Sequence, residues 1–126
     1  MRISKLSKPV MVAWVIRKAW KLAESTPADL ERQLSELTPG ARNAKDGECA
    51  VCRQAVLRYS AKMRGKYCLQ RSIATYLLCY SWYGSVPKLV IGARLDPFQA
   101  HAWVEEDGNA LDTIPVRDTF TILQEI

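Results

Sequence analysis

Apolar residues recur at helical spacing in the first part of the chain and alternate with polar residues in the last part. Residues from Pro9 to about Ala23 are predicted to form a helix whose first half is apolar on most sides, which indicates deep burial or a partner surface. Thr26 caps a second helix, Pro27 takes its first position, and one face carries Leu30, Leu34 and Leu37. The chain is therefore expected to begin with two helices.

The helical pattern returns over residues 48–64, where small and apolar residues recur at spacings of three and four: Cys49, Cys52, Val56, Tyr59 and Met63. Gly65 interrupts this helix. A further helix is predicted over about residues 66–82, with Gly84 as its terminator. Cys68 is therefore expected in the first turn of a helix that is largely buried.

Downstream of these helices the pattern changes to β. Residues 88–94 are predicted to form a strand, and residues 100–106 and 109–113 to form a hairpin around Asp107-Gly108. A last strand is predicted over residues 119–123. Helices first and antiparallel strands afterwards indicate an α+β fold, in which N-terminal helices pack on a small antiparallel sheet.

Length and composition suit a single domain. The chain has 126 residues, of which 48% are hydrophobic and 25% charged, as in ordinary globular proteins. Residues 1–68 contain 14 Lys and Arg against 6 Asp and Glu, whereas residues 69–126 contain 4 against 7. The two halves are therefore expected to face different partners. No zinc-finger spacing or RNA-binding aromatic motif accompanies the basic half, so we expect no nucleic-acid partner.

The N-terminus resembles a secretory signal peptide, because basic residues precede an apolar run over residues 10–16. This run ends at Arg17-Lys18 without a small-residue cleavage site, and it is too short to span a bilayer. We therefore expect a cytoplasmic protein without membrane insertion. Its cysteines, Cys49, Cys52, Cys68 and Cys79, are then expected to be reduced thiols.

Cys49 and Cys52 form a Cys-x-x-Cys pair, a spacing that can serve zinc binding or redox chemistry. The chain has one histidine and no second such pair, and both residues fall on the apolar stripe of their predicted helix. We therefore expect both to pack in the core, and we expect neither a metal nor a cofactor.

His101 is the single histidine of the chain, and histidine is the side chain that titrates near neutral pH without perturbation. Alternation places it on the more polar face of its strand. With a two-residue turn at Asp107-Gly108, Val104 pairs with Leu111, and Asp112 becomes a diagonal neighbour of His101 on the same face. A carboxylate there fixes the imidazole tautomer and supports its protonated form. The alternative is a half-exposed strand histidine with no role.

A cysteine at a helix start favours the thiolate, because unpaired amides and the positive end of the helix dipole lie beside it. Cys68 as nucleophile, His101 as base and Asp112 as orienting acid form a candidate triad of the papain type. The backbone amide of Cys68 is then the natural donor to the oxyanion. Gln70 and Gln99 are candidates for a second donor.

Several motifs resemble those of a known family. They are Cys68-Leu69-x-Arg71-Ser72 before an apolar helix, Leu89-Val90-Ile91-Gly92-x-Arg94, Asp96-Pro97-Phe98-x-Ala100-His101-Ala102-Trp103-Val104-Glu105, and Gly108. In these residues the chain resembles the lasso-peptide biosynthesis B protein, a family of leader peptidases with a transglutaminase-like cysteine-protease fold. The resemblance covers about residues 48–126, whereas residues 1–47 match only in being helical.

The resemblance implies a cysteine endopeptidase that removes the leader from a ribosomally made precursor peptide. A partner, the ATP-dependent lasso cyclase, then closes the isopeptide ring on the freed N-terminus. The resemblance also implies that Cys68 and His101 are catalytic. The acidic residue of the family often follows an Asn-like residue and would fall on Thr113, whereas the carboxylate in this chain is Asp112. The assignment of the acid therefore rests on the hairpin geometry.

Some members of this family carry an N-terminal winged-helix domain that grips the leader, and residues 1–47 lack its strand patterns. We therefore expect a single domain over residues 1–126, with a helical extension at 1–47 and a catalytic core at 48–126, that depends on a separate leader-recognition protein. Candidate docking surfaces are the apolar first helix and a basic face formed by Arg53, Arg58, Lys62, Arg64 and Lys66. The alternative is a core helix and a solvated face.

Two other functions use the same fold. The triad also suits acyl transfer to an amine, as in transglutaminases, and exclusion of water decides between transfer and hydrolysis. A non-catalytic adaptor is the third possibility, and it requires Cys68 to be unreactive.

Overall fold

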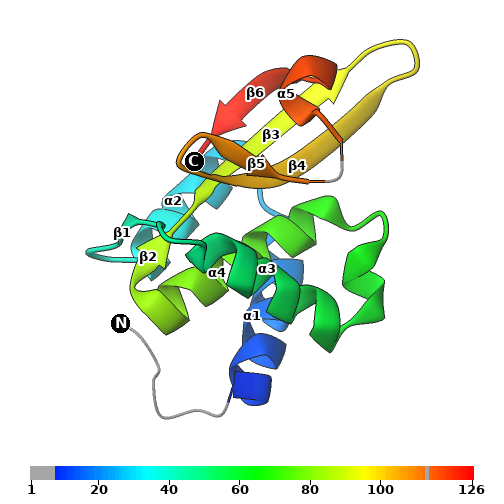
Figure 1. The fold of residues 1–126 in the computed structure, drawn as a ribbon. Coiled ribbons are helices and arrows are strands. Elements are labelled where there is room, and N and C mark those ends of the chain that lie inside the picture. Colours follow the sequence, from blue (N-terminus) through cyan, green and yellow to red (C-terminus); the bar gives the residue numbers. More distant parts are fainter. Residues whose placement is uncertain (1–7, 113) are drawn as a thin grey trace.

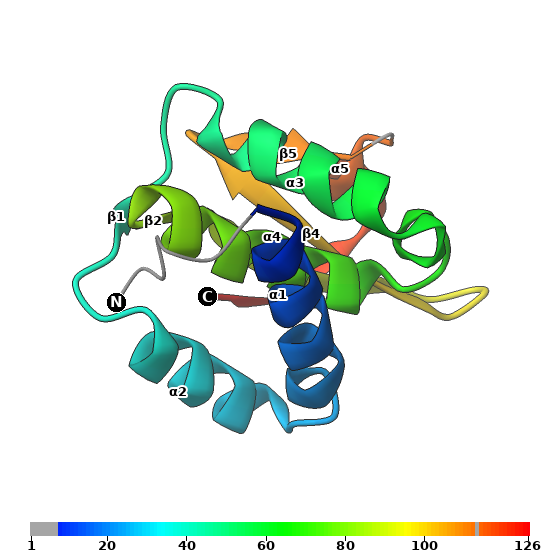
Figure 2. The same ribbon diagram turned by 90° about the horizontal axis from the view of Figure 1, so that it is seen from below.

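The computed structural model describes residues 8–112 and 114–126 and shows helices packed on a small sheet (Figure 1, Figure 2). The helices are α1 (Lys8–Leu22), α2 (Pro27–Leu37), α3 (Glu48–Tyr59), the 3₁₀ helix η1 (Ala61–Arg64), α4 (Cys68–Tyr83) and α5 (Val116–Thr119). The strands are β1 (Arg42–Asn43), β2 (Ser85–Val86), β3 (Lys88–Arg94), β4 (Gln99–Glu106), β5 (Asn109–Leu111) and β6 (Thr121–Glu125). The predicted α+β fold is confirmed.

The main sheet is antiparallel and has the strand order β5-β4-β3-β6. Asp107 and Gly108 form the turn between β4 and β5 with positive φ angles of 52° and 79°, as a two-residue hairpin turn requires. Val104 pairs with Leu111, so the predicted hairpin register is confirmed. Among the described residues no strand continues beside β4 beyond Leu111, so the part of β4 that contains His101 has one open edge.

The main core is built around α4, which packs on β3 and β4 of the sheet and is contacted by α1 and α3 (Figure 2). Leu30 and Leu34 of α2 belong to the same cluster. Every residue of α4 from Arg71 to Tyr80 is buried. Val15 of α1 and Val56 of α3 are fully buried in the same cluster. Helix α1 therefore packs as part of the domain core, while Val10 and Trp14 on its outer side remain 51% and 40% exposed.

The other face of the sheet is also covered, which the alternating pattern of β4 did not predict. Helix α5 and the residue that follows it, Phe120, form a second, smaller core with two strand residues: Val90 and Trp103. Glu105 is only 3% exposed, and it accepts hydrogen bonds from Trp103 Nε1 at 2.8 Å and from two nitrogens of Arg117 at 2.7 Å. The face of β4 that was predicted to be polar is therefore covered by α5, and the Glu105 carboxylate on it is paired with Arg117.

Several elements differ from the predictions. The single helix expected over residues 48–64 is divided into α3, which ends at Tyr59, and the 3₁₀ helix η1. Residues 109–113 were expected to form one strand, but β5 ends at Leu111; Thr113 lies outside the described residues. The last strand begins at Thr121 instead of residue 119, because α5 occupies the preceding residues. The parallel pair β1–β2 was not predicted. Two-residue strands and single helical turns are too short to show periodicity.

The N-terminal basic residues Arg2 and Lys5 lie outside the described part of the chain. No helix among the described residues is long and apolar enough to cross a membrane.

Gly92 of β3 lies opposite His101 and is tightly enclosed. A methyl group there would lie 3.0 Å from Phe120 Cβ, 3.0 Å from the carbonyl oxygen of Thr121 and 3.1 Å from the Trp103 ring. We expect Gly92→Ala to reduce the free energy of unfolding by about 1–3 kcal/mol, as overpacked cores do. Chemical unfolding measures this. Gly65→Ala is the control, because its methyl group would find its nearest neighbour 3.8 Å away. Equal stability of the two variants would contradict the expectation.

Candidate active site

Cys68 is the first residue of α4, and no side chain caps this helix end. The amides of the first turn and the helix dipole therefore favour a negative charge on the thiol. Arg71, one turn further, fixes where the helix begins: its Nη1 donates to the carbonyl oxygens of Met63 at 2.9 Å and Gly65 at 3.0 Å. The turn before α4 is thereby tied to the helix that carries the thiol.

Aromatic contacts also hold the start of α4 against α1. The ring of Tyr67, which precedes Cys68, lies 4.8 Å from the ring of Trp20. The ammonium group of Lys62 lies over both rings, at 4.7 Å from Trp20 and 5.2 Å from Tyr67. Such contacts stabilise packing between elements that are distant in sequence.

The hairpin brings His101 and Asp112 together, as its register predicts. His101 Nε2 lies 2.6 Å from Asp112 Oδ2, and the two side chains are 14% and 8% exposed. The imidazole also stacks on Phe120 at 5.2 Å and on Trp103 at 5.9 Å. With Nε2 donating to the carboxylate, Nδ1 is the ring nitrogen left for the thiol.

The thiol and the imidazole meet at the open edge of β4. Hydrogen bonding with the His101 side chain and with the backbone N–H of Ala102 lowers the pKa of the Cys68 thiol. Ala102 lies beyond the last described pair of the β4–β5 ladder. The structure thus brings Cys68, His101 and Asp112 into one cluster, although they come from a helix start, a strand and the end of a hairpin.

The electrostatics of this cluster favour a charged pair. Burial acts to raise the pKa of Cys68, but the hydrogen bonds from His101 and Ala102 and the charges of His101 and Arg71 lower it below its usual value overall. The hydrogen bond with Cys68 raises the pKa of His101, burial opposes it, and Asp112 raises it further. The lowered pKa of Cys68 and the raised pKa of His101 both increase the population of thiolate and imidazolium at neutral pH.

The other three cysteines have the opposite environment. Cys49, Cys52 and Cys79 have no exposed surface, so the predicted core packing of the Cys-x-x-Cys pair is confirmed. Hydrogen bonds with Cys49 and Cys52 raise the pKa of Cys79, and burial raises it further. The residues that the structure describes contain no group of three or more His, Cys, Asp or Glu that is placed to hold a metal ion.

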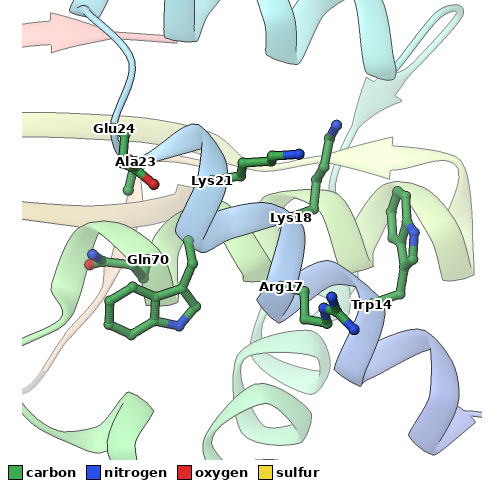
Figure 3. A pocket seen from close by; sticks show the side chains of 8 residues that line it. Trp14, Arg17, Lys18, Lys21, Ala23, Glu24 and Gln70 are labelled. Atoms are coloured by element: carbon green, nitrogen blue, oxygen red, sulfur yellow. The ribbon is translucent and has the colours of Figure 1, made fainter.

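The two glutamines considered as oxyanion donors lie elsewhere. Gln70 lines a hollow of about 800 Å³ that follows α1 (Figure 3). Gln99 is exposed at the start of β4. The hollow that contains His101 and Asp112 has a volume of about 350 Å³, and neither glutamine lines it. The larger hollow contains basic and aromatic side chains, whereas the smaller one contains the candidate base His101 and the candidate acid Asp112, so the smaller one is the candidate active site.

The five residues predicted to form one basic face point in different directions. Arg53 and Arg64 line the hollow of the candidate active site. Arg58 lines a separate hollow on another side of α3. Lys62 and Lys66 lie over the aromatic ring that precedes α4. Tertiary structure therefore divides this set, and two of its members belong to the site.

The fold and the site define an α+β domain in which a helix-start thiol faces a strand imidazole and a carboxylate. The sequence matches the model of the transglutaminase-like superfamily over residues 12–125. The chain therefore belongs to the transglutaminase-like superfamily. No curated protein and no solved structure matches it.

We expect iodoacetamide to alkylate Cys68 in the folded protein with a pH midpoint below about 8.5, the usual thiol value. His101→Ala should raise this midpoint, because the largest influence lowering the pKa of Cys68 is lost. Alkylation that is quenched at set times and followed by peptide mapping measures the reaction rate of each cysteine.

The buried thiols of Cys49, Cys52 and Cys79 serve as internal controls and should react only after unfolding. A Cys68 midpoint equal to that of a free thiol, unchanged in His101→Ala, would contradict the charged pair.

Proposed function

We propose that this protein is a cysteine endopeptidase that removes the leader from a ribosomally synthesised lasso-peptide precursor. The observation that carries the proposal is the cluster of Cys68, His101 and Asp112, with the 2.6 Å contact between the last two. Membership of the transglutaminase-like superfamily supports thiol-based acyl chemistry. The motifs around Cys68 and His101 support the narrower choice of a leader peptidase.

In the proposed reaction the Cys68 thiolate attacks the carbonyl carbon of the scissile peptide bond. The carbonyl oxygen becomes an oxyanion, and the amide of Cys68 at the start of α4 donates a hydrogen bond to it. The imidazolium of His101 gives its Nδ1 proton to the leaving nitrogen as the C–N bond breaks. The products of this step are the freed core N-terminus and a thioester between Cys68 and the leader.

Water completes the cycle. Neutral His101 takes a proton from a water molecule, whose oxygen attacks the thioester carbonyl carbon and expels the Cys68 thiolate. Asp112 keeps Nε2 protonated throughout, so Nδ1 faces the reacting groups in both halves of the reaction. The leader leaves with a new carboxylate, and the thiolate–imidazolium pair is restored.

We propose that the substrate is delivered by a separate leader-recognition protein in the cytoplasm, where thiols stay reduced, and that a lasso cyclase uses the product. The hollow along α1 is the proposed docking surface (Figure 3). It presents Arg17, Lys18 and Lys21 beside Trp14, which is 40% exposed. This combination suits an acidic partner surface with an apolar centre.

We expect purified protein to cleave the precursor peptide encoded beside its own gene, in the presence of the leader-recognition protein. Cys68→Ala and His101→Ala should each reduce the rate by roughly 10³-fold or more, as loss of a nucleophile or its base does. Mass spectrometry identifies the products, and circular dichroism controls for folding. An amine-capped leader, formed when an amine is added, would indicate acyl transfer. Undiminished cleavage by Cys68→Ala would refute the proposal.

Asp112 contributes orientation and charge, and two substitutions separate these contributions. Asp112→Asn retains an acceptor for Nε2–H, so it should keep more activity than Asp112→Ala. In both variants the alkaline limb of the pH–rate profile should move to lower pH, because the carboxylate raises the pKa of His101 and its charge is gone. A profile identical to that of the wild type in both variants would exclude Asp112 from this role.

A further inference from the structure

Three arginine side chains converge on the hollow that contains His101 and Asp112. They come from separate elements: Arg53 from α3, Arg64 from the end of η1, and Arg71 from α4. Among the described residues, no carboxylate forms an ion pair with any of the three. The hollow therefore carries a net positive charge, since Asp112 is the one acid among its lining residues.

The contacts of these arginines hold them in place without neutralising them. Arg64 Nε donates to the carbonyl oxygen of Leu57 at 3.1 Å, and Arg71 donates to two carbonyl oxygens of the turn before α4. Arg71 is 8% exposed and is the one buried arginine among the described residues. Burial lowers its pKa, and the nearby charge of Arg53 lowers it further, whereas the charges of Cys68 and Asp112 raise it. A buried cation beside another cation is costly unless an anion joins them.

The one acid that lines this hollow is already engaged. Asp112 contacts His101 Nε2 at 2.6 Å, so the positive charge of the imidazolium balances the negative charge of this carboxylate. Three guanidinium groups thus face one carboxylate that is committed to the triad. Guanidinium groups bind carboxylates through paired, charge-assisted hydrogen bonds, which makes a carboxylate the ligand that this hollow suits best.

We propose that Arg53, Arg64 and Arg71 form a subsite for an acidic side chain, Asp or Glu, of the peptide substrate. The inference rests on the proposed function in that the ligand is a peptide cut at Cys68. Because His101 lines the same hollow, the acidic residue lies close to the scissile bond. The subsite would both position the peptide and exclude peptides with a basic residue at that place.

The first test uses two alkylating agents of similar size, neutral iodoacetamide and anionic iodoacetate, and needs no peptide substrate. The measured quantity is the ratio of the iodoacetate to the iodoacetamide rate constant at Cys68, divided by the same ratio for free cysteine. We expect this preference to fall by roughly fivefold in Arg53→Gln/Arg64→Gln, the size that two exposed charge pairs give together. Added salt should weaken the wild-type preference.

Arg58→Gln is the matched control, because it removes one charge from the same helix as Arg53 but lines a different hollow. Its preference should equal that of the wild type. The iodoacetamide rate reports the thiolate itself, so it separates the two proposals: a slow rate in the wild type contradicts the proposed function. If the wild type reacts quickly with iodoacetamide and Arg53→Gln/Arg64→Gln keeps the wild-type preference for iodoacetate, the proposed subsite is contradicted.

The second test identifies the source of the carboxylate. Acetylated and amidated Ala-Glu-Ala should protect Cys68 from iodoacetamide better than the matching Ala-Gln-Ala peptide, and the difference should vanish in the double variant. Acetyl-Ala-Ala-Ala with a free terminal carboxylate is the comparison. Protection by this last peptide alone would overturn an acidic side chain in favour of a chain terminus. Equal protection by all three peptides would overturn the subsite.

Discussion

The end of β5 is the constraint on which the candidate site depends. Because the ladder between β4 and β5 stops at the pair of Val104 and Leu111, the next residue, Asp112, lies where its carboxylate reaches His101. Ala102 lies beyond the last described pair of this ladder, and hydrogen bonding with its backbone amide lowers the pKa of the Cys68 thiol. If β5 continued along β4, it would cover the edge at which the thiol and the imidazole meet. A helix on one face of the sheet and a side chain from the other can therefore share a site.

Two cores hold the reacting groups from opposite sides. Helix α4 is buried along most of its length, and Arg71 ties its first turn to the turn before it, so the thiol has a rigid support. On the other face, Phe120 and Trp103 stack on the imidazole, and Gly92 leaves room for Phe120 Cβ and the Trp103 ring. Buried Glu105 secures this layer through Trp103 and α5. The most distinctive motif in the sequence, residues 96–105, thus serves largely to position His101.

Local signals in the sequence predicted most of the fold, and tertiary contacts determined what they missed. Thr26 accepts from the amide of Asp29 at 3.3 Å as the cap of α2, and the Asp107-Gly108 turn set a register that led to the contact of His101 with Asp112. Helix α5 spans one turn and has no periodicity, so the second core was missed. The predicted basic face grouped Arg53 with Arg64, but it also included Arg58 and left out Arg71, because the packing of η1 and α4 against α3 decides which side chains line the hollow.

The thiol of Cys68 and the imidazole of His101 form one electrostatic unit, in which each group shifts the pKa of the other. His101 is the single histidine of the chain, so its ring signal in an NMR pH titration needs no assignment. We expect His101 of the wild-type protein to titrate above about 6.5, the usual value for histidine. In Cys68→Ala its pKa should be clearly lower, because the hydrogen bond with the thiol is the largest influence raising it. The same pKa in both proteins would show that the thiol and the imidazole do not interact.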